Sequence, residues 1–281
     1  MRTLDVSEVS ARVREAVQAI NFHTPAPVLV QLNDVRLNEP SEAGRLAMHD
    51  IVVNRQVASE MQVPMCQDTG MVVVFVDLGQ DLRLTGGDLR AAIMEGVRQG
   101  YAEGYLRKSV VAEPLFERRN TGDNTPAVVH FDLNPGDHLR LTVAAKGFGA
   151  ENMSRVRVLT PANRLEALKR EVVQVVQDAG PNACPPVVVG VGLGGTLEMA
   201  ALLAKKALMR AVGQRHPEPR YAELELELLD LVNRTGIGPQ GWGGVNTALD
   251  VRIEYYPTHI AAVPVAINLD CHLQRHIDLE L

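Results

Sequence analysis

Two runs of aliphatic residues most constrain the fold: "MVVVFVDL" at residues 71–78 and "PPVVVGVGLGGT" at residues 185–196. Each run is short and bounded by turn-forming residues, so each predicts a strand buried on both faces. Segments with helical spacing of apolar residues surround them, such as "TPANRLEALKREVVQVVQDAG" at residues 160–180. Buried strands among amphipathic helices predict an α/β (mixed α+β) fold, with mixed sheets flanked by helices.

Helix ends can be predicted from capping residues. Asp88 precedes one helical pattern and Gly104 follows it. In the segment at residues 160–180, Thr160 is the expected N-cap and Pro161 the first-turn residue. These residues predict one helix between Asp88 and Gly104 and another between Thr160 and Gly180.

Two further runs, "PAVVHFDL" at residues 126–133 and "HLRLTVAAK" at residues 138–146, have the composition of strands. The turn sequence "NPGD" separates them, so they are predicted to be paired strands.

The composition of the chain limits which classes of function are possible. The chain has 281 residues, 46% hydrophobic residues and a formal net charge of −6. A single domain over 1–281, or two closely packed subdomains, is expected for this length. An acidic chain without a long Lys/Arg cluster is a poor candidate for nucleic-acid binding. No apolar run approaches the ~18 residues of a membrane span, and the N-terminus does not resemble a signal peptide. A cytoplasmic protein is expected.

Gly190, Gly192 and Gly195 match the pattern G-x-G-x-x-G after a predicted strand. A dinucleotide-binding fold also needs a second strand ending in an acidic residue about 20 residues later. The corresponding segment, "RHPEPRYAELELELL", has the pattern of a loop and a helix, which argues against a nucleotide site. A glycine loop at a helix N-terminus can still present N–H groups to an anion.

The chain has three cysteines, Cys66, Cys184 and Cys271, and no CxxC pair. An odd number argues against a disulfide framework. Each cysteine lies at an end of a predicted strand, and strand ends are where α/β proteins commonly have their binding and catalytic sites. Three thiolates can hold three irons of a [4Fe–4S] cluster and leave one iron open as a Lewis acid. Zinc held by three cysteines and a histidine, and simple burial of each thiol, are the alternatives.

Six blocks together resemble the class I, iron–sulfur-dependent fumarate hydratases and the related L(+)-tartrate dehydratases. They are "PMCQDTG", "RRNTGDNTPA", "KGFGAENMS", "CPPVVVGVGLGGT", "NRTGIGPQGWGG" and "PTHIAAVPVAINLDCHLQRH". The resemblance runs from about residue 40 onward. It implies that Cys66, Cys184 and Cys271 hold a [4Fe–4S] cluster whose fourth iron binds the substrate.

The resemblance also implies the residues that contact the substrate. Gln67 and Asp68 would face it, with Asp68 as the general acid. Gly149 would offer a backbone contact, and His259 and Arg107 would bind substrate carboxylates. Where the family pattern leads us to expect a further glycine before Gly149, this chain has a phenylalanine.

The resemblance further implies an α subunit, because single-chain relatives continue into a second region that supplies a catalytic threonine and more basic residues. We therefore expect a β subunit as partner and a heterotetramer of two αβ pairs. The expected reaction is reversible hydration of fumarate to L-malate, a step of the tricarboxylic acid cycle. The alternatives are dehydration of L(+)-tartrate to oxaloacetate, with the same cluster, and a metal-stabilised scaffold without catalysis.

Overall fold

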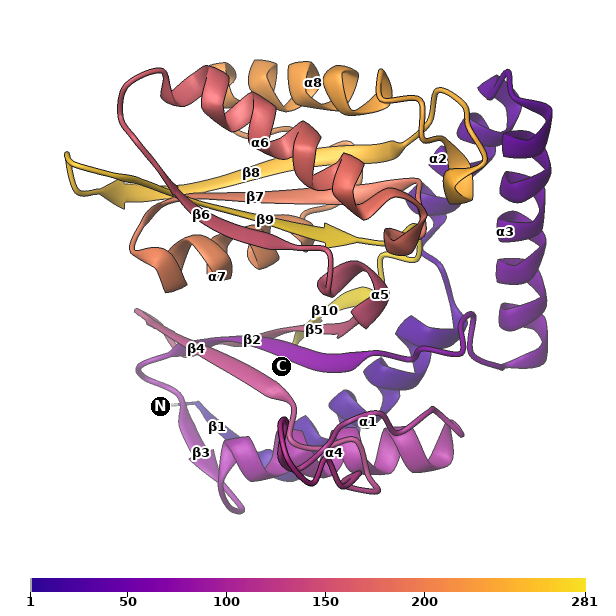
Figure 1. Cartoon of the computed structure of the whole chain (residues 1–281). Helices are drawn as coiled ribbons and strands as arrows, with labels where there is room; N and C mark the ends of the chain where they lie inside the picture. Colours follow the sequence, from indigo (N-terminus) through magenta and orange to yellow (C-terminus); the bar gives the residue numbers. More distant parts are fainter. Residues whose placement is uncertain (1) are drawn as a thin grey trace. The chain divides into compact units, whose positions relative to one another are not determined.

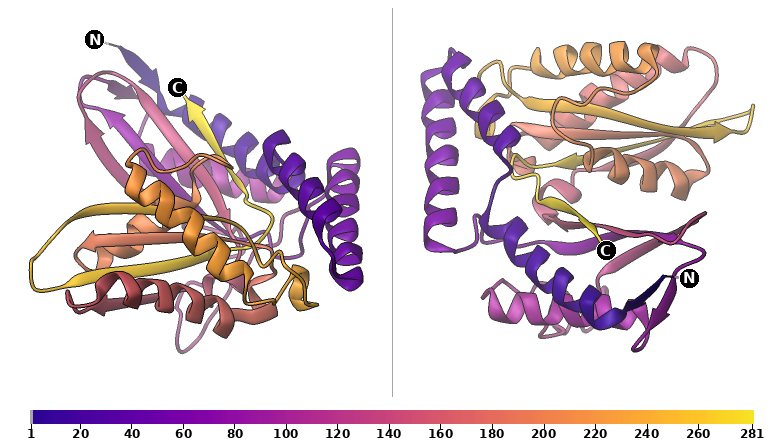
Figure 2. Two further views of the ribbon diagram at one scale, coloured as in Figure 1. Left: turned by 90° about the horizontal axis from the view of Figure 1, so that it is seen from above. Right: turned by 180° about the vertical axis from the view of Figure 1, so that it is seen from behind.

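The computed structural model describes residues 2–281 and divides the chain into two compact units, each described here by itself (Figures 1 and 2). Unit 1 comprises residues 2–24, 55–148 and 275–281, and unit 2 comprises residues 25–54 and 149–274. Both units combine helices with a sheet that contains parallel and antiparallel pairs. The predicted α/β (mixed α+β) class is therefore confirmed.

Unit 1 is built on a four-stranded sheet with the order β10–β5–β2–β4. The helices α1 and α4 pack with β2 and β5 in one apolar core. The elements of unit 1 are β1 (Thr3–Asp5), α1 (Val6–Phe22), β2 (Met71–Gly79), β3 (Arg83–Thr85), α4 (Leu89–Glu103), β4 (Val128–Asn134), β5 (Leu139–Lys146) and β10 (His276–Glu280).

The predicted pairing of the strands now labelled β4 and β5 is wrong, because β2 lies between them. β2 pairs with β4 in parallel and with β5 in antiparallel orientation. β2 carries the longest apolar run of the three and is almost entirely buried, so the central position suits it. β4 is mostly exposed and occupies the edge.

Unit 2 is built on a second four-stranded sheet, with the order β6–β9–β7–β8. Helices α6 and α8 share an apolar core with one face, and α7 packs against the other (Figure 1). The elements of unit 2 are α2 (Ala26–Asn38), β6 (Arg155–Leu159), α6 (Arg164–Ala179), the 3₁₀ turns η1 (Gly180–Ala183) and η2 (Pro239–Gly241), β7 (Val187–Gly195), α7 (Leu197–Leu208), α8 (Pro219–Asn233), β8 (Ala248–Thr258) and β9 (Val263–Asp270). The chain passes between the units at four places: between α1 and α2, within α3 (Glu42–Met61), within α5 (Phe148–Glu151) and just before β10.

The helix ends were predicted with mixed success. Asp88 caps α4 by accepting a hydrogen bond from the Ala91 amide at 2.7 Å, and Gly104 ends that helix, as predicted. The predicted N-cap at Thr160 is wrong, because α6 begins at Arg164. Asn163 has φ +54°, a left-handed conformation that a helix interior does not allow, so the helix starts only after it.

Gly190 and Gly192 lie inside β7, and Gly195 is the last residue of that strand, so the glycine pattern lies mostly within the strand rather than in a loop. A Cβ atom on Gly190 would lie 2.2 Å from the Ala204 carbonyl oxygen, and one on Gly192 would lie 2.0 Å from that of Ala200. Both carbonyls belong to α7. The glycines therefore allow the helix backbone to approach the strand closely.

No helix in the described part of the chain is long and apolar enough to cross a membrane.

Candidate functional site

The loop before β2 carries the first cysteine. Cys66 is half-buried, and its Sγ atom accepts a hydrogen bond from the Asp68 amide at 3.4 Å. Hydrogen bonds to the cysteine sulfurs are among the features by which proteins tune iron–sulfur clusters, so this N–H group suits a cluster ligand. Gln67, between them, is exposed.

The Asp68 carboxylate is held by two backbone amides. Its Oδ1 accepts from the Gly70 amide at 2.9 Å, and its Oδ2 accepts from the Phe148 amide at 2.8 Å. The carboxyl group is therefore oriented by the backbone and only half-buried, so a bound molecule can reach it. Asp68 contacts only the backbone amide of Phe148, and the Phe148 side chain is exposed. This hydrogen bond therefore does not require the glycine expected at that position.

Arg275 is a residue that the sequence analysis missed. Its side chain is buried, and Nη1 donates to the Asp68 carbonyl oxygen at 2.7 Å and to Asn21 Oδ1 at 2.9 Å. A Cβ atom on Gly147 would lie 3.1 Å from Arg275 Nη2, so the glycine leaves room for the guanidinium. The only sequence signal was its position, four residues after Cys271.

Two more buried side chains fix the end of the loop. The Tyr101 hydroxyl donates to the carbonyl oxygens of Thr69 at 2.8 Å and Gly70 at 3.0 Å, and Asn124 Nδ2 donates to Gly70 at 3.2 Å. Burial raises the pKa of Tyr101 well above its usual value, so the hydroxyl keeps its proton. Residues 62–70, the Asp68 loop, are thus preorganised by neutral donors as well as by Arg275.

Arg107 lies beside this loop, because its carbonyl oxygen accepts a hydrogen bond from Thr69 Oγ1 at 2.9 Å. Its side chain is exposed, and its guanidinium has no hydrogen bond or ion pair within residues 2–281. Unit 1 therefore brings together Cys66, Gln67, Asp68 and Arg107 of the predicted site.

In unit 2 the sheet brings Cys184 and Cys271 to the same end. Val188 of β7 pairs with Asp270 of β9 in antiparallel register. Cys271, the next residue after β9, therefore lies beside the start of β7. Cys184 lies three residues before that start and has φ +54°. The prediction that these cysteines lie at strand ends is confirmed.

Gly149 also lies at this place in unit 2. A Cβ atom on Gly149 would be 3.3 Å from the Asn182 carbonyl oxygen, two residues before Cys184. Gly149 is exposed.

The sheet does not bring His259 to the cysteines. His259 follows β8 and precedes β9, where its Nδ1 accepts from the Ala261 amide at 3.2 Å. Cys271 follows the other end of β9. The eight residues of this strand span about 26 Å at ~3.3 Å per residue. His259 and Cys271 therefore lie at opposite ends of the sheet.

The three cysteines suit an iron–sulfur cluster by their chemistry. None of them forms a disulfide, and each is half-buried. Within residues 2–281, no group of three or more His, Cys, Asp or Glu side chains forms a ready metal site. Cys66 belongs to unit 1 and the other two belong to unit 2. The chain passes between the units at Phe148–Gly149 and at Gln274–Arg275, next to predicted site residues.

Comparison with known proteins gives a consistent result over most of the chain. The family model described as "Fumarate hydratase (Fumerase)" matches residues 10–280. A Methanocaldococcus jannaschii protein, provisionally named as L(+)-tartrate dehydratase subunit alpha, is 38% identical over 95% of this chain and 95% of its own length. The L(+)-tartrate dehydratase subunit alpha of Escherichia coli K12 is 34% identical over 96% of this chain and 89% of its own.

Proposed function

The chain belongs to the fumarate hydratase (Fumerase) family of hydro-lyases, and on that basis we propose that it is the α subunit of a two-subunit [4Fe–4S] enzyme that reversibly hydrates fumarate to L-malate. The subunit names of the relatives support a β subunit as partner. Residues 1–281 would act as one hydro-lyase α-subunit domain in the cytoplasm.

Cys66, Cys184 and Cys271 would hold the cluster. The N–H group directed at Cys66 and the shared sheet end of the other two support this assignment. When bound, the cluster supplies an iron without a thiolate ligand, a Lewis acid that polarises the C–O bond of the substrate.

Asp68 would deliver the proton to the departing hydroxyl group. The observation that carries this proposal is the geometry of its carboxylate, fixed by the amides of Gly70 and Phe148 two residues after Cys66. A carboxyl group that is oriented before the substrate arrives transfers its proton with little reorganisation. The base that removes the carbon-bound proton would come from the β subunit.

The substrate carboxylates need positive charge and hydrogen-bond donors, because proton removal beside a carboxylate develops negative charge. Arg107 has an uncommitted guanidinium beside the Asp68 loop. Gln67 would add a side-chain amide, and Gly149 a backbone N–H.

His259 of one copy of the chain would bind a substrate carboxylate in the site of a second copy. Its position at the end of the sheet opposite the cysteines supports this arrangement, since one copy cannot place both at one substrate molecule. We therefore propose a heterotetramer of two αβ pairs, in which each α subunit contributes His259 to the other's site.

L(+)-tartrate is the second candidate substrate, because the relatives described above are named as tartrate dehydratase subunits. Tartrate carries one more hydroxyl group than malate. One or two groups in the pocket are enough to decide such a difference.

One assay decides between the two substrates. The complex with its β subunit is purified without oxygen, and dehydration rates of L-malate and L(+)-tartrate are compared at equal concentrations. Faster turnover of malate supports the fumarate hydratase. Faster turnover of tartrate would support a tartrate dehydratase instead. If neither compound is turned over, both proposed substrates are refuted.

Metal analysis of the same complex tests the cofactor. We expect about four irons and four sulfides per α subunit, with the cluster lost in Cys66→Ser, Cys184→Ser and Cys271→Ser. Zinc without sulfide would instead support the metal-stabilised scaffold.

A further inference from the structure

Gln274 follows Cys271 by three residues and has an unusual environment. Its side chain is 2% exposed, and its backbone has φ +49°. Arg252, which is fully buried, donates from Nη2 to Gln274 Oε1 at 3.1 Å. Arg252 is itself held by Asp250 Oδ2 at 2.9 Å and by the Leu208 carbonyl oxygen at 2.9 Å.

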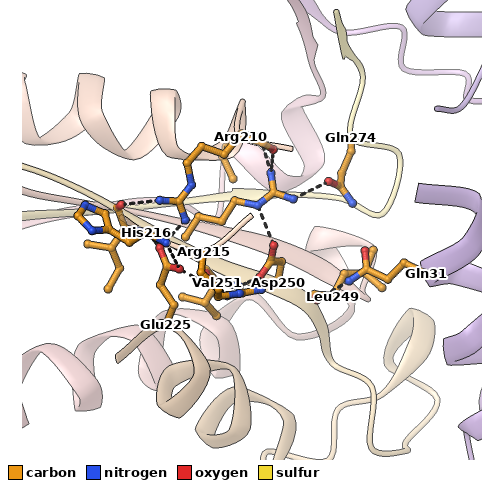
Figure 3. A network of polar contacts seen from close by, with 12 residues as sticks. Gln31, Arg210, Arg215, His216, Glu225, Leu249, Asp250, Val251 and Gln274 are labelled. Carbon is orange, nitrogen blue, oxygen red and sulfur yellow. Dashed lines mark hydrogen bonds and ion pairs between the residues drawn. The ribbon is translucent and has the colours of Figure 1, made fainter. Parts of the chain in front are cut away.

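This contact fixes the orientation of the Gln274 amide. A guanidinium has only donors, so the amide oxygen must face Arg252 and the amide nitrogen must face away. Figure 3 shows this arrangement, with the oxygen of Gln274 on the hydrogen bond and the nitrogen on its other side. Nε2 is buried and has no hydrogen-bond partner among the described residues.

A buried donor without a partner is rare in folded proteins and indicates an acceptor that the chain itself does not supply. We propose that Gln274 Nε2 donates a hydrogen bond to a sulfur of the cluster, either the Cys271 thiolate or a sulfide. This inference rests on the proposed cluster. Hydrogen bonds to sulfur stabilise the more negative, reduced state and are among the factors that set cluster potentials.

Gln31 offers the competing explanation. Its Nε2 donates to the Leu249 carbonyl oxygen at 2.8 Å, while its Oε1 is also buried without a partner in the described residues. A water molecule bonded to Gln31 Oε1 and Gln274 Nε2 would satisfy both atoms without any contact to sulfur.

Three variants of the anaerobically purified αβ complex separate these possibilities. Gln274→Met removes both the acceptor for Arg252 and the donor. Gln274→Glu keeps an oxygen for Arg252 and removes the donor. Gln31→Leu removes the competing acceptor. The readouts are the reduction potential of the cluster and its Fe–S stretching frequencies.

We expect both Gln274 variants to shift the oxidised-to-reduced equilibrium about tenfold toward oxidised, or ~59 mV for a one-electron couple. Gln31→Leu should match the wild type. Unchanged potentials and frequencies in both Gln274 variants would overturn the inference.

A shift in only one Gln274 variant would also overturn it. With Met alone, the shift would report the lost contact to Arg252, and with Glu alone it would report the added charge. An equal shift in Gln31→Leu would overturn it too, because it would mean that a water held by both glutamines, and not Gln274 itself, donates to the sulfur. If Gln274→Met does not fold, Gln274→Leu replaces it as the neutral variant.

The wild-type complex keeps the two proposals apart. If it contains no iron and sulfide, the proposed function fails and this inference fails with it. An intact wild-type cluster with unresponsive Gln274 variants overturns the hydrogen bond alone.

Discussion

Replacement of Arg275 by methionine tests whether this buried arginine holds the Asp68 loop. The change keeps a long apolar side chain but removes the donors to Asp68 O and Asn21 Oδ1. A hydrogen bond to a charged group contributes ~1.5–3 kcal/mol, so the two contacts together contribute about 3–6 kcal/mol. The lower end is expected, because the variant also avoids the cost of burying a charge.

A loss of about 3 kcal/mol corresponds to a decrease in Tm of roughly 6–12 °C for a chain of this size. Thermal unfolding of the αβ complex, followed by circular dichroism, measures this change. Turnover should fall as well, since the carbonyl of Asp68 is no longer restrained.

Arg107→Met is the matched control, because its guanidinium is exposed and has no partner in the described residues. It should change stability by less than about 0.5 kcal/mol, yet reduce turnover if Arg107 binds a carboxylate. A Tm of Arg275→Met within about 2 °C of the wild type would refute the reasoning, since it corresponds to less than ~1 kcal/mol.

Asp68→Asn should keep the cluster, measured as iron and sulfide, but lower kcat by about 10²–10⁴; normal turnover would exclude its role as acid. Gly192→Ala would place a Cβ atom 2.0 Å from the Ala200 carbonyl oxygen. It should therefore destabilise unit 2 by ~1–3 kcal/mol or more in denaturant unfolding, and an unchanged midpoint would contradict the close packing. Burial raises the pKa of Asp278, but hydrogen bonds from Thr142 and Arg140 outweigh it and hold the pKa below its usual 3.8. The stabilising effect of the ionised Asp278 is present above that pH and is lost as the pH falls below it. Asp278→Asn should therefore flatten the acid end of a curve of Tm against pH. Parallel curves for the variant and the wild type would argue against this contribution.

Features set by neighbouring residues could be predicted from the sequence. The Asp88 cap and the buried strands β2 and β7 follow from local pattern, and the cysteines at strand ends follow from their positions beside those strands. Asn163 shows the limit of such patterns, since its left-handed backbone moved the start of α6 away from Thr160.

Features that depend on distant partners could not be predicted. The insertion of β2 between β4 and β5 is decided by which strand gains most from burial on both faces. The contact of Arg275 with Asp68 joins residues about 200 positions apart, and no local pattern encodes it. The separation of His259 from Cys271 becomes visible only when the strand between them is known to be fully extended.

The position of β10 in the sheet of unit 1 has a consequence for synthesis of the protein. His276 of β10 pairs with Ala144 of β5, and roughly 130 residues separate them in the chain. At 5–20 residues per second, a ribosome needs about 7–26 s to make that intervening segment. During this interval the edge of β5 lacks its neighbour, and the Asp68 loop lacks Arg275. An open strand edge can pair with other chains, so nascent unit 1 is exposed to misassembly until β10 has been made.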